Sequence, residues 1–237
     1  MESTNRMKRF VLSPLLVTGL LGVCAACSQG ATGEENFTPL FNGRNLEGWI
    51  GATDQYVVEE GVIVLPKGRG GKLLTQGQYD DFILRFEFKL TPNANNGLAI
   101  RAPVDGDAAY NGMELQILDG SSGKYPDLKP YQTHGSIYGV APAKRGFLKP
   151  VGAWNQQEVA CRGRNLRVTL NGHVILDVNL DEVAPEGKTI DGQNHPGLQN
   201  TKGHLGFLGH GDQIAIRNIR IQTSDSENTS KRKQDNP

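Results

Sequence analysis

Polar side chains that could exchange a proton with a substrate interrupt one of the most apolar segments of the chain. In an extended segment Glu114 and Gln116 share one face, and Asp119 follows them. The opposite face carries Met113, Leu115 and Ile117. A carboxylate, an amide and a second carboxylate within six residues could hold a sugar and exchange a proton with it. The alternative for such a pattern is a solvated strand face without a catalytic role.

Two further side chains could support such chemistry. Arg101 follows a segment in which Leu98 and Ile100 alternate with small residues, which leaves room for a ligand beside its guanidinium. His134 precedes another apolar segment, and its reference pKa near neutrality suits an acid or a base. An exposed edge-strand arginine and a structural histidine are the alternatives at these two positions.

Metal chemistry has weak support in the sequence. His204 and His210 share parity in one segment, but no third ligand lies at a telling spacing. The glycine-rich basic segment 67–72 precedes no helix that would complete a phosphate site. We therefore expect no metal and no cofactor.

Period-two alternation of apolar residues predicts the elements that must position these groups. The clearest strand is 82–90, where five apolar side chains from Phe82 to Leu90 face one way and Arg85, Glu87 and Lys89 face the other. The other predicted strands are 56–65, 97–101, 113–118, 136–140, 154–161, 166–170, 173–178, 204–208 and 214–222. Asn171-Gly172 predicts a tight hairpin, because both turn positions of a type I′ turn need positive φ.

Short strands joined by loops, with 30 glycines and 12 prolines, predict an all-β domain, either a sandwich or a barrel. Lysine and arginine total 25 and so do aspartate and glutamate. This balance argues against a nucleic-acid partner. The three cysteines, two of them in the first 27 residues, provide no disulfide framework.

The first 27 residues have the pattern of a bacterial export signal. A basic start precedes an apolar stretch from Phe10 to Val23, and Cys24-Ala25-Ala26-Cys27 resembles a lipobox. We predict a lipoprotein signal over 1–26, lipidation at Cys27, a tether over 27–36, one β domain over 37–223 and a disordered tail over 224–237. The location would then be periplasmic or on the outer membrane, with a lipid anchor as the only membrane contact. Ordinary secretion after cleavage at an alanine is the alternative.

An ordered series of motifs resembles the 3-keto-disaccharide hydrolase family, also described as 3-keto-glucoside lyase/hydratases. It covers about residues 36–223 and includes Phe37 to Gly43, Leu46 to Trp49, Asn96-Gly97, Glu114 to Asp119, Gly135 to Gly139, Trp154-Asn155, Asn171-Gly172, Gly203 to Gly206 and Arg217 to Ile219. The resemblance implies a single concanavalin A-like jelly-roll β-sandwich. Ala153 stands where the family usually has a glutamate.

The resemblance also implies an activity, the cleavage of glycosides already oxidised at C3, by elimination and hydration at C1 and C2. From the residue chemistry in and beside its matched motifs we assign Glu114 as the base, Arg101 as the enolate stabiliser and His134 as the leaving-group acid. The residues expected to bind the sugar are Gln116, Asp119, Trp154 and His210. A 3-oxidising sugar dehydrogenase would have to act first on the small oligosaccharide or glycoside substrate.

Two other functions remain open at this point. The first is a non-catalytic carbohydrate-binding module, for which Trp154 and Tyr110 are candidate aromatic contacts. The second is a laminarinase-like endo-glucanase, because the segment from Glu114 to Asp119 resembles the E-x-D-x-x-E strand of glycoside hydrolase family 16. Gln116 replaces the middle aspartate and Asp119 the last glutamate, which argues against double-displacement hydrolysis.

Overall fold

Two antiparallel sheets form the domain. The structure is a computed structural model that describes residues 36–121 and 123–223. The predicted signal, Cys27, nearly all of the tether and the predicted tail lie outside these residues. Among the residues that the structure describes, no helix is long and apolar enough to cross a membrane.

The larger sheet, sheet A, has eight strands. Its order is β11-β10-β9-β6-β13-β4-β3, and β1 pairs with β13. The bounds are Thr38–Pro39 (β1), Val57–Glu59 (β3), Val62–Leu65 (β4), Phe82–Leu90 (β6), Trp154–Arg162 (β9), Asn165–Leu170 (β10), His173–Asn179 (β11) and Ile214–Thr223 (β13).

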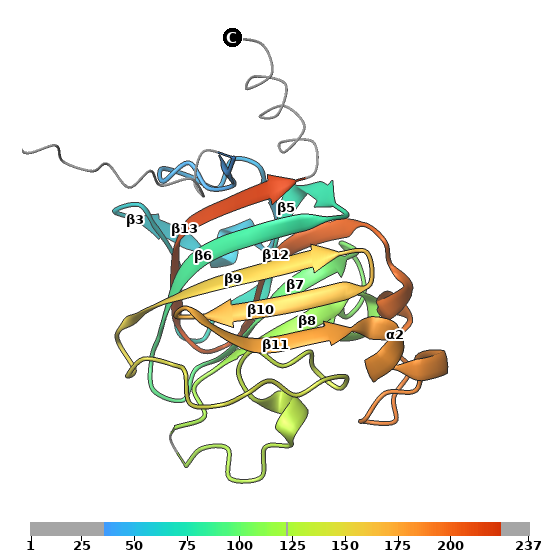
Figure 1. The fold of residues 1–237 in the computed structure, drawn as a ribbon. Helices are drawn as coiled ribbons and strands as arrows, with labels where there is room; N and C mark the ends of the chain where they lie inside the picture. Colours follow the sequence, from blue (N-terminus) through green and yellow to red (C-terminus); the bar gives the residue numbers. More distant parts are fainter. Residues whose placement is uncertain (1–35, 122, 224–237) are drawn as a thin grey trace, which may run out of the picture. The chain divides into compact units, whose positions relative to one another are not determined.

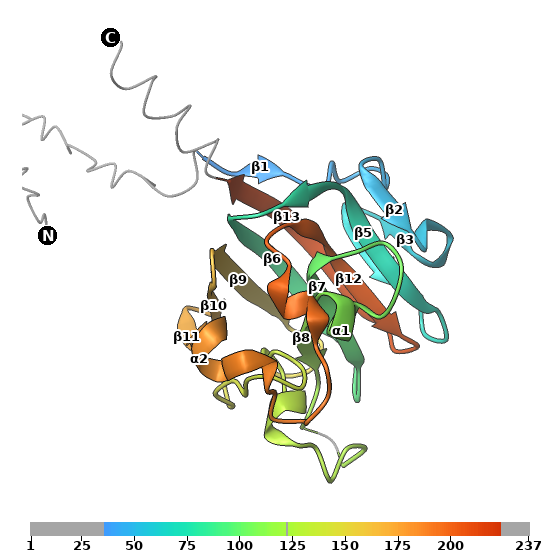
Figure 2. The ribbon, with the colours of Figure 1, turned by 90° about the vertical axis from the view of Figure 1, so that its right-hand side faces the viewer.

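The smaller sheet, sheet B, has five strands in the order β2-β5-β12-β7-β8. Their bounds are Trp49–Gly51 (β2), Gly70–Tyr79 (β5), Asn95–Ala102 (β7), Met113–Leu118 (β8) and Gly203–His210 (β12). Figure 1 shows β6, β9, β10 and β11 of sheet A in front of β12, β7 and β8 of sheet B. The view turned by 90° shows the two layers from another side (Figure 2).

The described helices are short. They are α1 (Ala108–Asn111), α2 (Leu180–Val183) and the 3-10 turns η1 (Thr53–Gln55), η2 (Pro130–Gln132), η3 (Pro185–Gly187) and η4 (Pro196–Gln199). Ala108 of α1 packs on Leu74, Ala99 and Leu208, which form a small apolar cluster separate from the main core. Because α1 also contacts β7 and β8, it holds the chain that follows β7 close to sheet B.

The core lies between the sheets and confirms the register predicted for 82–90. Every second side chain of β6, from Phe82 to Leu90, is buried. Phe86 meets Phe207 of sheet B edge to face, with ring centroids 5.4 Å apart. The all-β, two-layer prediction is therefore confirmed.

The two-residue hairpin predicted at Asn171-Gly172 is also present. Leu170 ends β10, His173 begins β11, and Asn171 and Gly172 have φ values of 50° and 84°. A second turn of this kind, at Glu60-Gly61, divides the single strand predicted over 56–65 into β3 and β4.

The structure also differs from the predicted strands at 136–140 and at β5, and it contains the short strands β1 and β2, which were not predicted. The predicted strand 136–140 is wrong: Gly139 has φ 73° and Ile137 makes only isolated bridges to Leu115 and Ala141. The strand β5 was not predicted, because Leu73 and Leu74 are both buried, one in the main core and the other under α1. A strand that buries apolar side chains on both faces does not show period-two alternation.

Candidate functional site

Glu114 and Gln116 project from the outer face of sheet B. The other three side chains of β8, those of Met113, Leu115 and Ile117, belong to the core between the sheets. Glu114 pairs with Ala99, and Gln116 pairs with Gly97, both on β7. The side chains on this stretch of β7 are thus small, and polar groups of β8 can extend over that strand.

The carboxylate of Glu114 extends from β8 across Gly97 of β7 toward β12. A Cβ atom on Gly97 would lie 2.0 Å from Oε1 of Glu114. On the far side of β7, the same oxygen lies 3.2 Å from Nε2 of His210, the last residue of β12. The absence of a side chain at Gly97 therefore permits the contact between Glu114 and His210.

Glu114 and His210 differ in exposure. The side chain of Glu114 is 6% exposed and that of His210 is 45% exposed. The hydrogen bond with Glu114 raises the pKa of His210 above its usual 6.5, which outweighs the lowering effect of partial burial. The pair is a carboxylate held behind an accessible imidazole, an arrangement that orients the imidazole and favours its protonated form.

Gln116 stands on the same outer face, two residues along β8. Its side chain is 5% exposed. Within the described part of the chain the side-chain amide of Gln116 has no hydrogen-bond partner. Its NH₂ group can therefore donate to an oxygen of a ligand on this face.

The structure contradicts the predicted role of Arg101 as the enolate stabiliser. It has φ 48° and is 1% exposed. Its guanidinium donates to the carbonyl oxygens of Asp80, Gly163 and Asn200, and to Oδ1 of Asp81. These contacts occupy all five N–H donors, so Arg101 joins three loops and has no donor left for an enolate.

Asp119 also has a structural role in place of the predicted sugar contact. Oδ2 accepts from the backbone of Asn93 at 2.9 Å, and Oδ1 accepts from the backbone and hydroxyl of Ser121 at 2.9 and 2.6 Å. Burial tends to raise the pKa of Asp119, but these hydrogen bonds lower it overall. The carboxylate is a buried anion that fixes the chain after β8.

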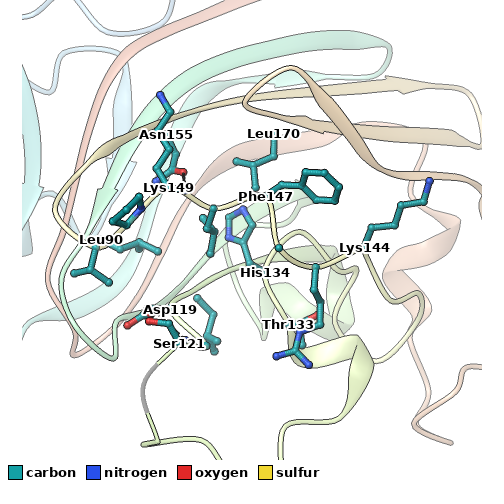
Figure 3. A pocket seen from close by; sticks show the side chains of 17 residues that line it. Leu90, Asp119, Ser121, Thr133, His134, Lys144, Phe147, Lys149, Asn155 and Leu170 are labelled. Carbon is teal, nitrogen blue, oxygen red and sulfur yellow. Dashed lines mark hydrogen bonds between the residues drawn. The ribbon is translucent and has the colours of Figure 1, made fainter.

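His134 lies in the interior, on the wall of a cavity of about 400 Å³ (Figure 3). Its ring stacks on Phe88, a core residue of β6, with centroids 5.2 Å apart. Burial lowers the pKa of His134 to about 4. The predicted acid therefore faces the core, whereas Glu114 faces outward, and His210 takes its place beside Glu114.

The cavity has a mixed lining, with apolar side chains such as Leu90, Phe147 and Leu170 and polar ones that include Lys144 and Lys149. Figure 3 shows both lysine side chains extending away from His134. Neither Glu114 nor His210 lines this cavity. Of the residues predicted as one site, Asp119 and His134 line this cavity, whereas Glu114, Gln116 and His210 lie on the outer face of sheet B.

Trp154 is also placed differently from the sequence prediction. It begins β9 of sheet A, where its neighbour Asn155 is buried and Trp154 faces outward. The guanidinium carbon of Arg217 lies 4.0 Å from the centroid of the Trp154 ring, and Nζ of Lys89 lies 5.0 Å from it. Trp154 and Glu114 thus lie on opposite outer faces of the sandwich, too far around the molecule to bind one sugar together.

The sequence prediction missed a second carboxylate–histidine pair. Nε2 of His195 lies 3.1 Å from Oδ2 of Asp191, and Nδ1 lies 3.2 Å from the carbonyl oxygen of Ala109. The only sequence signal for this pair is the spacing of four residues between Asp191 and His195. These residues lie in an irregular segment, where that spacing does not predict a contact. Both side chains are almost fully buried, so the pair supports neighbouring residues and does not itself face solvent.

The two histidines of β12, His204 and His210, make separate contacts. The described residues contain no group of three or more His, Cys, Asp or Glu side chains that could hold a metal ion. His204, the other histidine of β12, contacts the carbonyl oxygen of Thr75 at 2.8 Å and Gln78 at 3.2 Å.

Comparisons with known proteins found matches that cover most of the described chain. The profile of the 3-keto-alpha-glucoside-1,2-lyase-like domain matches residues 36–222. Over 232 residues the chain is 24% identical to a 3-keto-disaccharide hydrolase of Bacteroides thetaiotaomicron, with coverage of 81% of this chain and 79% of that protein.

Solved structures agree with the fold. The crystal structure of a candidate glycosyl hydrolase from Parabacteroides distasonis has a TM-score of 0.70 and 30% identity, with coverage of 79% of this chain and 98% of that one. A Bacillus subtilis protein with a galectin-like fold has a TM-score of 0.53 at 11% identity, with coverage of 79% and 94%. The latter likeness concerns the fold alone and agrees with the predicted jelly-roll sandwich.

Proposed function

Because this chain belongs to the 3-keto-alpha-glucoside-1,2-lyase-like domain family, we propose that it cleaves glycosides that carry a ketone at C3 of the sugar. The match spans Glu114, Gln116 and His210 together with both sheets. The relative from Bacteroides thetaiotaomicron, named as a 3-keto-disaccharide hydrolase, supports the same substrate class.

The ketone determines the chemistry. A carbonyl at C3 acidifies the hydrogen on C2, so a base can remove it and leave an enolate. The electron pair then forms the C1–C2 double bond as the bond from C1 to the glycosidic oxygen breaks. Addition of water across this double bond gives the free keto sugar, and the sum of the two steps is hydrolysis. Such a site needs a base near C2 and a proton for the departing oxygen.

The contact between His210 and Glu114 is the observation that carries the proposal. With Nε2–H donated to Glu114, Nδ1 of the accessible imidazole is free to take the C2 proton. The buried carboxylate stabilises the imidazolium that results. This imidazolium can return the proton to the glycosidic oxygen, which supplies the acid that His134 cannot provide. The base is thus the pair, in place of Glu114 alone.

Gln116 supplies the second element of the proposal. Its amide projects from the same outer face as Glu114, two residues away. In this position it can donate a hydrogen bond to an oxygen of the bound sugar and orient C2 toward the imidazole. The enolate oxygen is the acceptor that gains most from such a donor, because its charge develops during the reaction.

Three substrates distinguish this function from its rivals. Purified protein would be incubated with a 3-keto-glucoside, with the unoxidised glucoside and with a plain β-glucan, and the released sugars quantified. We expect release from the 3-keto-glucoside alone. Release from the β-glucan would favour the endo-glucanase, and binding without any release would favour a carbohydrate-binding module.

The proposed location follows from the N-terminal pattern. A basic start, an apolar stretch and small residues before Cys27 favour export and lipidation. Cys27→Ser should move the protein from the membrane fraction to the soluble periplasmic fraction of the cells. A membrane fraction unchanged by this substitution would contradict the anchor. In that compartment the substrate would come from a dehydrogenase that oxidises C3 of a glycoside.

A further inference from the structure

Three tyrosines gather beside the edge strand β8. Tyr138 is the central one: its ring lies 6.4 Å from that of Tyr110 and 6.0 Å from that of Tyr131, each at an interplanar angle of 88°. Tyr110 belongs to α1 and Tyr131 to η2, so three separate segments contribute. All three side chains are half-buried, which leaves part of each ring accessible. We call Tyr110, Tyr131 and Tyr138 the tyrosine cluster.

Hydrogen bonds place Tyr138 next to Glu114. The backbone N–H of Tyr138 donates to the carbonyl oxygen of Glu114 at 2.9 Å, and Ile137 forms an antiparallel bridge with Leu115. Residues opposed in this way project to the same side, with Cβ atoms about 5 Å apart. Ile137 and Leu115 both enter the core, so Tyr138 and Glu114 both face outward. His210, Glu114 and Tyr138 therefore follow one another across the outer face of sheet B.

The buried His195–Asp191 pair fixes the position of the cluster. The ring of Tyr110 lies 4.7 Å from that of His195. Gly139, next to Tyr138, has φ 73°, and a Cβ atom there would lie 2.3 Å from Oδ2 of Asp191 and 2.7 Å from Nε2 of His195. The carbonyl of Gly139 accepts from the backbone of Asp191 at 3.2 Å. The tyrosine rings are thus held in place before any ligand binds.

The cluster has the chemistry of a sugar-binding surface. Half-exposed tyrosines present an apolar ring for the C–H face of a pyranose and a hydroxyl for its oxygens. Burial, together with the nearby Tyr138, Asp191 and Asp107, raises the pKa of Tyr110. Its hydroxyl therefore stays protonated and can donate as well as accept.

We propose that the tyrosine cluster binds the leaving group of the substrate, a second pyranose ring joined through the glycosidic oxygen. This inference rests on the proposed function, because it takes C1 and C2 of the keto sugar to lie at His210 and Glu114. A substrate that extends from this pair along the outer face brings its second ring to Tyr138. The enzyme should then prefer disaccharides to glycosides with a small aglycone.

The test compares a 3-keto-disaccharide with methyl 3-keto-glucoside. For Tyr138→Ala and Tyr110→Ala we expect kcat/KM on the disaccharide to fall about tenfold, through KM, with activity on the methyl glycoside within twofold of the wild type. Tyr138→Phe keeps the ring and should retain most of the activity. Tyr125→Ala removes a half-exposed tyrosine outside the cluster and is the matched control.

The possible outcomes separate the two claims. An equal loss on both substrates, or no loss on the disaccharide, would overturn the tyrosine site while the proposed function stands. If the wild type cleaves neither substrate, the proposed function is wrong, and NMR titration with the unoxidised disaccharide decides the site. Weaker binding by Tyr138→Ala than by Tyr125→Ala would then support a disaccharide site, and equal binding would overturn it.

Discussion

The carboxylate of Glu114 occupies the space where a side chain of Gly97 would stand. A Cβ atom at Gly97 would come within 2.0 Å of Oε1 of Glu114 and 2.7 Å of its carboxyl carbon. Gly97 lies on the strand between Glu114 and His210, so its missing side chain is what allows the carboxylate to reach the imidazole. The backbone at Gly97 is not in the left-handed region, so the requirement for glycine here is purely one of space.

The first prediction follows from this contact. Gly97→Ala should displace the carboxylate and separate it from His210, because a methyl group cannot share its position. We expect kcat on a 3-keto-glucoside to fall by about 10²-fold or more, since the imidazole loses the group that orients it. Activity assays and thermal unfolding of the same preparation provide the measurement.

Gly123→Ala is the matched control for this substitution. A Cβ atom at Gly123 would meet nothing within 4 Å, and its φ is not positive. The control should keep wild-type activity. Wild-type activity in Gly97→Ala as well would show that the Glu114–His210 contact is dispensable.

The second prediction concerns pH. The pKa of His210 is raised by Glu114, and the proposed base is the neutral imidazole. The value of kcat/KM should therefore rise with pH as His210 loses its proton, with a midpoint above 6.5. Glu114→Gln removes the charge, so the remaining activity should have a midpoint lower than that of the wild type. A midpoint that stays in place after this substitution would exclude His210 as the titrating base.

The third prediction concerns stability in acid. The buried imidazole of His134 has a pKa of about 4 in the folded protein, against about 6.5 when exposed. The unfolded state therefore binds this proton more readily. The resulting stability is complete above pH 6.5 and is lost as the pH falls toward 4, by roughly 3 kcal/mol.

His134→Gln tests this dependence. Urea unfolding at pH 7.5 and at pH 4.5 would be compared for the variant and the wild type. The wild type should lose more free energy of unfolding between these two pH values than the variant, because glutamine does not titrate. Equal losses in both proteins would show that His134 is not the acid-sensitive group.

The sequence predicted the strands whose two faces differ in polarity. Phe82 to Leu90 alternates because β6 has one face in the core and the other partly exposed. Glu114 and Gln116 were assigned to the correct face of β8 because polar and apolar residues alternate there, although both faces of this strand are buried. The strand β5 could not be found in this way, since Leu73 and Leu74 are both covered. Periodicity reports a difference in polarity between the two faces and gives no signal where apolar side chains are buried on both.

The sequence could not group the site residues correctly. His210 and Glu114 are 96 positions apart and come together only because β12, β7 and β8 are adjacent in sheet B. Arg101 and His134 have the residue types of a catalytic site, yet the donors of Arg101 are occupied by carbonyl oxygens and by Asp81, and His134 stacks on Phe88. Residue type predicts which chemistry is possible, but the number of free hydrogen-bonding groups depends on tertiary contacts.

The central claim is that the Glu114–His210 pair removes the C2 hydrogen of a 3-keto sugar. The most direct measurement follows a 3-keto-glucoside that carries deuterium at C2 and determines, by mass spectrometry, the deuterium left in the released sugar. The account predicts loss of deuterium to solvent in the wild type and turnover lowered by about 10²–10⁴-fold in Glu114→Gln, which retains the fold. Full retention of deuterium in the released sugar, together with an active Glu114→Gln variant, would contradict both the mechanism and the assigned pair.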